Sequence, residues 1–452
     1  MNNHFKQFIL FLGDITLMNL SLYLALWLRY GENPAQGSWQ INWEPFAVIF
    51  IFWLIAFYIS NLYNLHLAIN NGLFFRRVAQ SFAIGAILAV VFFYLAPPDK
   101  LTPKTNLAVF IVVFAGIFII WRQLFNSLLK SYLPRTNLAV IGFNNLVEKI
   151  ISELKQKPQL GLSLSFVMDE HSSQKEIYGM PIFNNLNELP ILIEKRKINN
   201  IILATTPDSQ ELRTLLFECL PLKITFTNLA DFYEGISGKI ALEVINKLWF
   251  LENLSEGDKT SFDSFKRAAD LVMGLIILIV SLPFWIIIGL IIKLESRGSM
   301  FYISKRCGQG GKEFKMIKFR TMRTENNHQG MTEIGDKRIT GFGNFLRKTR
   351  LDELPQTINI IKGEMSFVGP RPERPEFVEI LEKQIPFYRE RMLVKPGITG
   401  SDQISGEYHS PSYEDTMKKL QYDLYYIKNR SIYLDLSIIL KTISTVLSRA
   451  GR

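Results

Sequence analysis

Hydrophobic residues in the first third of the chain are gathered in four long runs separated by short polar segments. The runs cover about residues 5–28, 44–63, 78–97 and 105–124. A helix needs ~20 mostly apolar residues to cross the hydrocarbon part of a bilayer, and each run is long enough. The pattern therefore predicts four transmembrane helices within residues 1–130.

The charges beside these runs predict how the helices are oriented. Arg76 and Arg77 lie between the second and third runs, and Arg122 and Lys130 are near the end of the fourth. Basic residues stay preferentially on the cytoplasmic side, which places both ends of this segment in the cytoplasm. Asp14 lies inside the first run, where we expect its carboxylate to face a partner on another helix.

Residues 131–250 show a different pattern, in which short β-branched runs alternate with segments of helical periodicity. The strand-like runs are "NLAVIGF", "LSLSFVM", "NNIILATT" and "KITFT". This alternation predicts a parallel sheet covered by helices. Gly142 follows the first strand, but "GFNNLV" has one of the three glycines of the dinucleotide pattern G-x-G-x-x-G. We therefore expect a degenerate Rossmann-like domain that serves oligomer contacts or regulation.

A fifth apolar run, Leu271–Ile292, is also long enough to cross a bilayer. Basic residues flank it on both sides: Lys266, Arg267, Lys293 and Arg297. Pro283 lacks an N–H and bends a helix, and Ser281 can hydrogen-bond a carbonyl that the bend releases. Two structures fit this segment. One is a fifth span with a proline kink, and the other is a re-entrant helix within residues 264–297 whose two ends both stay in the cytoplasm.

The last part of the chain, residues 298–452, is richer in charge, glycine and proline. Its most unusual stretch is "TRLDELPQTINIIKGEMSFVGPRPERPEF", in which the adjacent acids Asp352 and Glu353 open a predicted helix that ends at Gly363. Acids in a first helical turn commonly just complement the helix dipole. Among arginines, however, we expect these carboxylates to have low pKa values, so that they can bind Mg²⁺ or attack phosphorus.

Basic residues surround the acidic pair in three segments. "KRCGQGGKEFKMIKFRTM" (305–322) contains Lys318 and Arg320 and predicts a strand with a basic face, and "RKTR" ends at Arg350. Prolines stiffen the backbone around Arg371 and Arg374. Guanidinium groups present the forked donors that phosphate oxygens prefer. The clusters together predict a phosphate-binding site, although each lysine alone fits a solvated basic surface.

The composition narrows the class of protein. The 452 residues carry a net charge of +10 and are 48 % hydrophobic, which suits a membrane protein that meets anionic lipid or phosphate-bearing ligands. Nucleic acid is not an expected partner, because the basic residues are dispersed and no known reader motif is present. Two cysteines and five histidines form no disulfide framework or zinc pattern. Near the end, "SIYLDLSIILKTISTVLSR" has the apolar spacing of a helix that lies in the membrane interface or packs on a core.

Residues 264–452 resemble the bacterial sugar transferases, the polyprenyl-phosphate hexose-1-phosphate transferases also described as monotopic phosphoglycosyl transferases. The resemblance rests on "KRAADLVMGLIILIVSLPFWIIIGLIIKLESRGSMFY", "KFRTM", the stretch around the acidic pair, "KPGITG" and "YDLYYIKNRSIYLDLSIILKTISTVL". Four preceding spans and a Rossmann-like domain are similar to the long members of the family, which start exopolysaccharide or O-antigen synthesis. The implied fold is membrane α plus α/β, with a catalytic α/β domain at 298–452 and a re-entrant membrane helix.

The resemblance implies a two-step reaction at the cytoplasmic face of the bacterial inner membrane. Asp352 attacks the β-phosphate of a UDP-sugar and releases UMP, and undecaprenyl phosphate then accepts the sugar phosphate. Glu353 completes the dyad by assisting the metal site or activating the acceptor, and Mg²⁺ bridges Asp352 and the diphosphate. Phosphate contacts are expected from Arg371, Arg320 and Arg350. A homodimer through the Rossmann-like domain is a further expectation.

One segment departs from the family pattern. Many relatives have an aromatic and a small residue after "PGITG", whereas this chain has Ser401 and Asp402. The departure bears on the preferred sugar, for which glucose and galactose are expected first. Two other functions compete with the transferase: a non-catalytic membrane scaffold of glycan assembly, and a membrane-anchored Rossmann-type oxidoreductase or epimerase.

Overall fold

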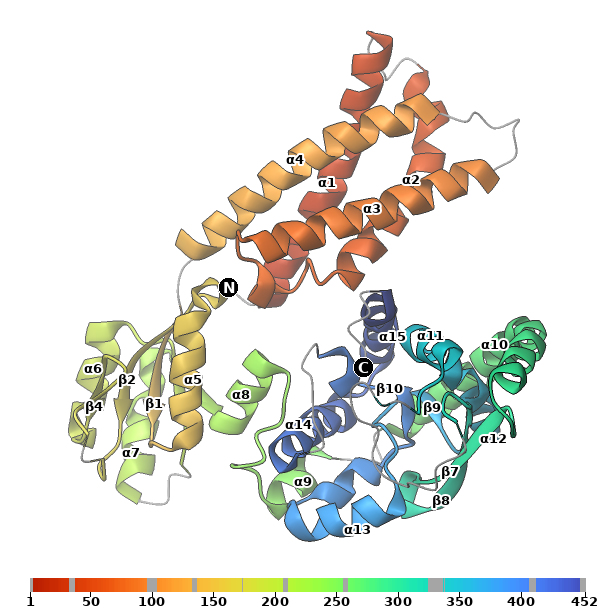
Figure 1. Ribbon diagram of the computed structural model, residues 1–452. Helices are drawn as coiled ribbons and strands as arrows, with labels where there is room; N and C mark the ends of the chain where they lie inside the picture. The colour runs from red at the N-terminus through yellow and green to blue at the C-terminus, as the bar shows by residue number, and fades with distance from the viewer. Residues whose placement is uncertain are drawn as a thin grey trace. The chain divides into compact units, whose positions relative to one another are not determined.

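The computed structural model divides the chain into two compact units, Met1–Phe232 and Tyr233–Arg452. Most of both units is helical, and the principal elements are labelled in Figure 1. The structure describes these residues: 3–31, 37–95, 104–131, 136–172, 174–205, 210–254, 259–323, 336, 338–405 and 412–447.

Four apolar helices open the first unit: α1 (Asn3–Tyr30), α2 (Ser38–Ile59), α3 (Gly72–Leu95) and α4 (Lys104–Ser131). Each is long and apolar enough to cross a membrane. They pack around a shared aromatic core that includes Phe46, Trp53, Phe57, Phe110, Phe114 and Phe118. The four predicted helices are therefore confirmed as helices, and their passage across a bilayer stays a prediction.

Asp14 does face a partner on another helix, as expected. Its Oδ2 lies 2.5 Å from Nη2 of Arg122 on α4, and its Oδ1 accepts from the Trp121 indole at 3.2 Å. Arg122 also donates to the Leu62 carbonyl at 2.8 Å. A buried charge is tolerated only when it is paired and hydrogen-bonded. The pair therefore fixes how α1 packs on α4.

A six-stranded sheet follows, with strand order β3-β4-β2-β1-β5-β6. The strands are β1 (Thr136–Ile141), β2 (Leu162–Met168), β3 (Glu176–Ile177), β4 (Met180–Phe183), β5 (Asn200–Leu203) and β6 (Thr225–Asn228). Only β3 runs antiparallel to its neighbour, so the sheet is mixed. The associated helices are α5 (Asn145–Gln156), α6 (Leu189–Arg196), α7 (Gln210–Glu218) and α8 (Leu229–Ser237). The order from β4 to β6 is that of a doubly wound sheet.

The turn after β1 differs from a dinucleotide-binding turn. Gly142 has φ 91°, and a Cβ there would lie 2.7 Å from Cγ2 of Thr205. The Asn144 side chain accepts hydrogen bonds from the amides of Leu146 and Val147. In a dinucleotide fold a pyrophosphate binds at this helix N-terminus. Here the side chain of Asn144 already accepts hydrogen bonds from two of the amides at this helix N-terminus.

The second unit contains the long helix α10 and two small sheets. Its elements are α9 (Lys247–Asn253), α10 (Thr260–Glu295), β7 (Phe301–Cys307), β8 (Glu313–Phe319), α11 (Gly341–Thr349), α12 (Thr357–Lys362), β9 (Ser366–Val368), α13 (Pro375–Gln384), β10 (Gly397–Thr399), α14 (Tyr413–Asn429) and α15 (Ile432–Leu447). β7 and β8 form an antiparallel hairpin, and β9 pairs with β10 in parallel. The predicted basic strand is therefore confirmed as β8.

α10 is one continuous helix that contains Pro283. Ser281 donates to the Leu278 carbonyl at 3.3 Å and accepts from the Trp285 indole at 3.0 Å. The serine therefore bonds the carbonyl three residues before it, which is not the Ile279 carbonyl that Pro283 leaves without its usual donor. α10 is long and apolar enough to cross a membrane, and the re-entrant path stays a prediction.

One stripe of α10 packs on the rest of its unit along most of the helix. Arg267 donates to the carbonyls of Ile360 and Ile361 at 2.6 and 2.7 Å, and Asp270 accepts from the Phe367 amide at 3.2 Å. Further along, Trp285 packs edge-to-face on Phe301 and Phe319. The opposite face exposes large apolar side chains: Val272, Ile276, Ile279, Phe284, Ile286, Ile287, Leu290 and Leu294.

α15 packs on the core of its unit, which is one of the two arrangements that its periodicity allowed. Ile438 is fully buried, and the hydroxyls of Thr442 and Thr399 lie 2.6 Å apart, which fixes one face of the helix on β10. The other face exposes Tyr433 and Leu436. The helix is therefore packed on a core and still presents apolar side chains outward.

Candidate active site

The acidic pair lies in a tight turn that leads into α12. Arg350 has φ 54°, a left-handed conformation that ends α11 and begins a 3₁₀ segment, Leu351–Gln356. Pro355 has no N–H to continue a regular ladder, and the α-helical part starts only at Thr357. The predicted helix is thus confirmed, with a 3₁₀ first turn. Glu353 is buried within this turn, and Asp352 is half-buried.

An asparagine fixes α12 against strand β8. Oδ1 of Asn359 accepts from the Ile317 amide at 3.1 Å, and its Nδ2 donates to the Lys315 carbonyl at 2.8 Å. The side-chain amide of Asn359 therefore accepts one hydrogen bond from the main chain of β8 and donates another to it, as a neighbouring strand would. This contact brings Lys318, at the end of β8, beside Glu353.

Glu353 is held by two cations. Its Oε1 accepts from Lys318 Nζ at 2.8 Å and from Arg371 Nη2 at 3.3 Å. The side chains of Glu353 and Lys318 are 8 and 16 % exposed, whereas that of Arg371 is 47 % exposed. Arg371 therefore has a surface that an incoming ligand can reach, while Glu353 and Lys318 form its buried support.

The two carboxyls have pKa values shifted in opposite directions. Burial alone would raise the pKa of Glu353, but the charges of Lys318 and Arg371 outweigh it and hold the pKa at about 2. Burial and the adjacent Glu353 charge raise the pKa of Asp352 to about 6. The expectation of a low pKa is therefore confirmed for Glu353 and wrong for Asp352, because burial and an ionised neighbour both disfavour its negative charge.

Cations exceed acids around the pair. The positive charges of Lys318, Arg347 and Arg371 act on Asp352, and Arg350 acts on Glu353. Oε2 of Glu353 and Nη1 of Arg350 are buried and have no hydrogen-bond partner among the described residues. Buried unpaired polar atoms are rare and often mark a place where a ligand completes the bonding. The excess positive charge suits a polyanion such as a diphosphate.

Arg320 and Arg374 do not join this cluster in the described contacts. Arg320 donates to the carbonyls of Arg297 and Ser296 at 3.0 and 2.6 Å, so its guanidinium caps the end of α10. These contacts favour a structural role in place of the predicted phosphate contact. Arg374 precedes α13, with its guanidinium 6.0 Å from the centre of the Phe377 ring.

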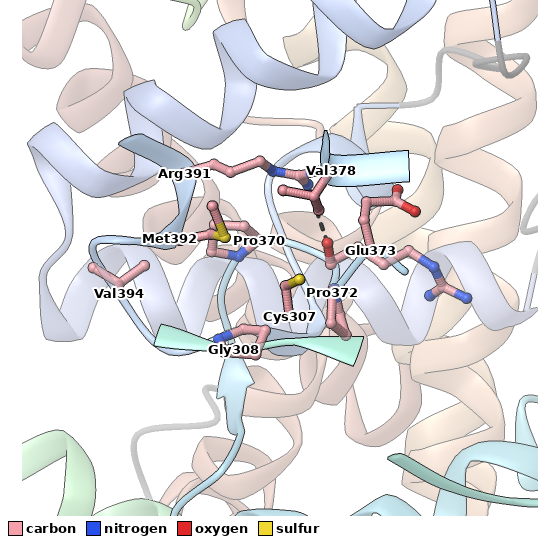
Figure 2. A pocket seen from close by; sticks show the side chains of 11 residues that line it. Cys307, Gly308, Pro370, Pro372, Glu373, Val378, Arg391, Met392 and Val394 are labelled. Atoms are coloured by element: carbon pink, nitrogen blue, oxygen red, sulfur yellow. Dashed lines mark hydrogen bonds between the residues drawn. The ribbon is translucent and has the colours of Figure 1, made fainter. Parts of the chain in front are cut away.

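A small pocket lies beside the loop that carries Arg371. Figure 2 shows Pro370, Pro372 and Glu373 on one side of it, with Arg391 and Met392 from a separate segment. Only about 20 Å³ of it is open to a water-sized molecule, which is little more than one water occupies. A sugar nucleotide does not fit there, so the pocket is a packing feature behind the loop.

A metal ion at the acidic pair would have few protein ligands. No group of three or more His, Cys, Asp or Glu residues that could hold a metal occurs in the described part of the chain. Mg²⁺ is commonly bound by one or two carboxylates, with substrate phosphates and water completing its shell. Asp352, with Oε2 of Glu353 beside it, fits this sparse donor set.

Sequence reasoning missed the residues that support the site from behind. Asn359 and the buried pair of Arg391 and Asp423 organise the neighbouring segments. An asparagine inside an apolar helix and single charges in two distant segments carry no motif. Their pairing becomes visible only when the fold brings the segments together.

Comparisons with known proteins match most of the chain. The sequence model described as "Bacterial sugar transferase" covers residues 261–449, and one described as "CoA-binding domain" covers residues 36–221. A UDP-glucose:undecaprenyl-phosphate glucose-1-phosphate transferase of Xanthomonas campestris pv. campestris is 32 % identical, over 73 % of this chain and 70 % of the relative.

Two further relatives match shorter parts. A UDP-N-acetylgalactosamine-undecaprenyl-phosphate N-acetylgalactosaminephosphotransferase of Aeromonas hydrophila is 35 % identical over 53 % of this chain and 56 % of its own length. A UDP-glucose:undecaprenyl-phosphate glucose-1-phosphate transferase of Escherichia coli (strain K12) is 41 % identical over 39 % of each chain. The chain thus spans a little over half of the Aeromonas relative.

Proposed function

The chain belongs to the bacterial sugar transferase family, and from that premise we propose that it transfers a hexose-1-phosphate from a UDP-sugar to undecaprenyl phosphate. It is a transferase of the undecaprenyl-phosphate sugar phosphotransferase type. The observation that carries the proposal is the half-buried Asp352, next to a Glu353 that Lys318 and Arg371 hold ionised.

The reaction has two displacements at one phosphorus. A carboxylate oxygen of Asp352 forms a bond to the phosphorus that carries the sugar, and UMP leaves with the bridging oxygen. An oxygen of undecaprenyl phosphate then bonds to the same phosphorus, and the bond to Asp352 breaks. The product is a diphosphate-linked sugar that starts an exopolysaccharide or O-antigen unit, and the carboxylate is restored.

The surrounding residues have separate roles in this scheme. Arg371 contacts donor phosphate with its exposed guanidinium, and Arg350 offers the buried Nη1 that has no described partner. Glu353 holds Lys318 and Arg371 in place; a carboxyl with a pKa of about 2 is too weak a base to activate the acceptor. Asp352 would hold Mg²⁺, which supplies positive charge to the diphosphate oxygens when bound.

The contacts of α10 support a helix that does not cross the membrane. Its contacts with the rest of the unit run from Arg267 to Ile292, whose carbonyl Arg320 approaches at 3.4 Å. These positions are ~37 Å apart in a straight helix, more than the ~30 Å of a hydrocarbon core. A span could touch a cytoplasmic domain only near one end. In this proposal the apolar outer side of α10 faces the bacterial inner membrane. Both ends of the helix stay on the cytoplasmic side of that membrane.

This placement lets a water-soluble donor and a lipid acceptor meet at Asp352. The first four helices add a multi-pass anchor, and the mixed sheet is the candidate contact for a homodimer. No observation favours the oxidoreductase alternative, because Asn144 takes the amides that a pyrophosphate would need. The scaffold alternative differs from the transferase in one respect: it needs no nucleophile.

UMP release by the purified protein tests the proposal. With Mg²⁺, undecaprenyl phosphate and a panel of UDP-hexoses, we expect UMP and a lipid diphosphate sugar from at least one donor. Without acceptor, intact mass should show a phosphosugar adduct on the wild type and none on Asp352→Asn. Absence of UMP with every donor, or wild-type turnover by Asp352→Asn, contradicts the proposed mechanism.

A further inference from the structure

The loop that carries Arg371 is held through its carbonyl groups. Pro370 and Pro372 have no N–H, so much of the loop's main-chain bonding must come from its oxygens. The four consecutive carbonyls from Pro370 to Glu373 accept hydrogen bonds, in order, from Gly397 N at 2.9 Å, Arg391 Nη2 at 3.0 Å, Arg306 Nη1 at 3.4 Å and Cys307 N at 2.9 Å. The carbonyl of Arg371 itself is therefore fixed by the side chain of Arg391.

Arg391 is the centre of a buried charged cluster. Its Nη2 lies 2.7 Å from Oδ2 of Asp423 on α14, and its Nη1 donates to the Tyr388 hydroxyl at 2.7 Å. The side chains of Arg391 and Asp423 are 7 and 3 % exposed. Figure 2 shows Arg391 reaching from its own segment toward the loop of Pro370 and Pro372. Three distant segments thus meet at one guanidinium.

A buried ion pair is a poor explanation for stability by itself. Removing two charges from water carries a desolvation penalty that their attraction offsets only in part, and apolar replacements of similar size are often neutral or stabilising. The pair therefore invites another role. The hydrogen bond to Arg371 supplies one, because a guanidinium can donate to a carbonyl while it is ion-paired with a carboxylate.

We propose that Arg391 and Asp423 are positioning residues that fix the main chain of Arg371, so that its exposed guanidinium meets the donor phosphate in a productive orientation. The inference rests on the proposed function of Arg371. Neither residue touches substrate: Asp423 orients Arg391, Arg391 holds the Arg371 carbonyl, and Arg371 makes the contact. A displacement of ~1 Å at a group that binds the reacting phosphate is enough to reduce turnover about 100-fold.

The decisive variant removes both charges and puts apolar side chains in their place. In Arg391→Met combined with Asp423→Leu, no charge is left buried and unpaired, so we expect a melting temperature equal to or above that of the wild type. Activity should nevertheless fall, with kcat/KM for the UDP-sugar about 10- to 100-fold lower. If the pair were purely structural, kcat/KM would fall only when the melting temperature falls. Wild-type kcat/KM in this folded variant overturns the inference.

A double-mutant cycle tests whether the pair acts through Arg371. The triple variant, which combines Arg371→Ala with the two apolar substitutions, should have the same kcat/KM as Arg371→Ala alone. The group that the pair positions is absent from both proteins. If the two losses multiply, the pair acts by another route and the inference is wrong. A wild-type protein that releases no UMP overturns the proposed function, and this inference with it.

A second buried arginine of the same unit serves as the control. Arg430 lies 3.1 Å from Oδ2 of Asp263 and donates to the Ile427 carbonyl at 3.0 Å. These contacts join the end of α14 to α10. Arg430→Met should lower the melting temperature and leave kcat/KM for the donor near the wild-type value. If Arg430→Met lowers kcat/KM as much as the apolar double variant does, the effect is general and the positioning role is refuted.

Discussion

Asp352 and Glu353 are neighbours in the chain, yet their surroundings push their pKa values in opposite directions. Glu353 accepts hydrogen bonds from two cations and stays ionised. Burial and the negative charge of Glu353 then raise the pKa of Asp352. The result is a carboxylate with a pKa near 6, which is ionised at neutral pH and more basic than a free aspartate. Such a group is better suited to bond phosphorus than an aspartate clamped by arginines.

The pH dependence of activity and the pH dependence of stability should both follow the ionisation of Asp352. We expect kcat/KM for the donor to rise as the pH increases through about 6. Because the folded pKa lies above the unfolded value, ionised Asp352 destabilises the fold by up to ~3 kcal/mol above that pH, and the penalty disappears as the pH falls below ~4. Asp352→Asn should therefore be inactive and melt higher at pH 8, with a smaller gain at pH 5.

Glu353→Gln is the matched control for this measurement. The folded pKa of Glu353 is depressed, so its contribution to stability is present above its unfolded pKa and disappears only as the pH falls toward 2. The glutamine variant should thus melt lower than the wild type at both pH 5 and pH 8. A lower melting temperature of Asp352→Asn at pH 8 would contradict the assigned charge states.

The sequence predicted the residues that contact the acidic pair better than it predicted the residues around them. Lys318 and Arg371 were predicted near the acids because basic clusters surround one acidic pair, and the structure brings both to Glu353. Arg320 is two residues beyond Lys318, a spacing that shares a face within a strand. β8 ends at Phe319, however, so the face is not continued and Arg320 turns to α10. A strand end cannot be located to one residue from composition.

At the scale of elements, α10 shows why a membrane path is hard to predict from apolar residues. The stripe that contacts protein contains small and polar residues such as Gly274, Ser281 and Gly289, whereas the exposed face is apolar throughout, the inverse of a soluble amphipathic helix. Hydrophobic periodicity assigns the apolar face to the core, and here the large apolar side chains are the exposed ones. The decisive contacts, such as Arg267 on the end of α12, involve residues outside the apolar run.

Cysteine labelling on both sides of α10 tests the proposed path. Ser264 and Ser299 are exposed and lie near the two ends of the helix. A membrane-impermeant maleimide should modify Ser264→Cys and Ser299→Cys in inside-out vesicles and neither in intact cells. Cys219 and Cys307 are buried, so the parent protein gives the background. Labelling of the two positions from opposite sides would show a crossing helix and contradict the proposal.

At the scale of the whole molecule, each of the two compact units has its own core. The sequence predicted four successive segments, of which the apolar helices and most of the α/β domain lie in the first unit. It did not predict the sugar. The relatives are named for glucose and for N-acetylgalactosamine, and such a choice depends on a few hydrogen bonds in a pocket.

Two compact units predict two unfolding transitions in detergent solution. UMP with Mg²⁺ at 100 times its Kd should stabilise one transition by ~2.7 kcal/mol, because the proposed binding site lies in the unit that contains Asp352. Arg122→Ala leaves Asp14 buried without its ion pair and should lower the other transition. Differential scanning calorimetry measures both. A single transition that responds to both changes would show that the units do not unfold separately.

The apolar outer face of α10 also bears on which bilayers support turnover. A helix seated in one leaflet has no counterpart to match in the other, so acyl-chain length should hardly alter how deep Asp352 sits. Thickness would instead be sensed by the first four helices, where tilt can absorb a mismatch. On the proposed path, the distance from Asp352 to the headgroups is set by protein packing, and we expect turnover to be insensitive to acyl-chain length.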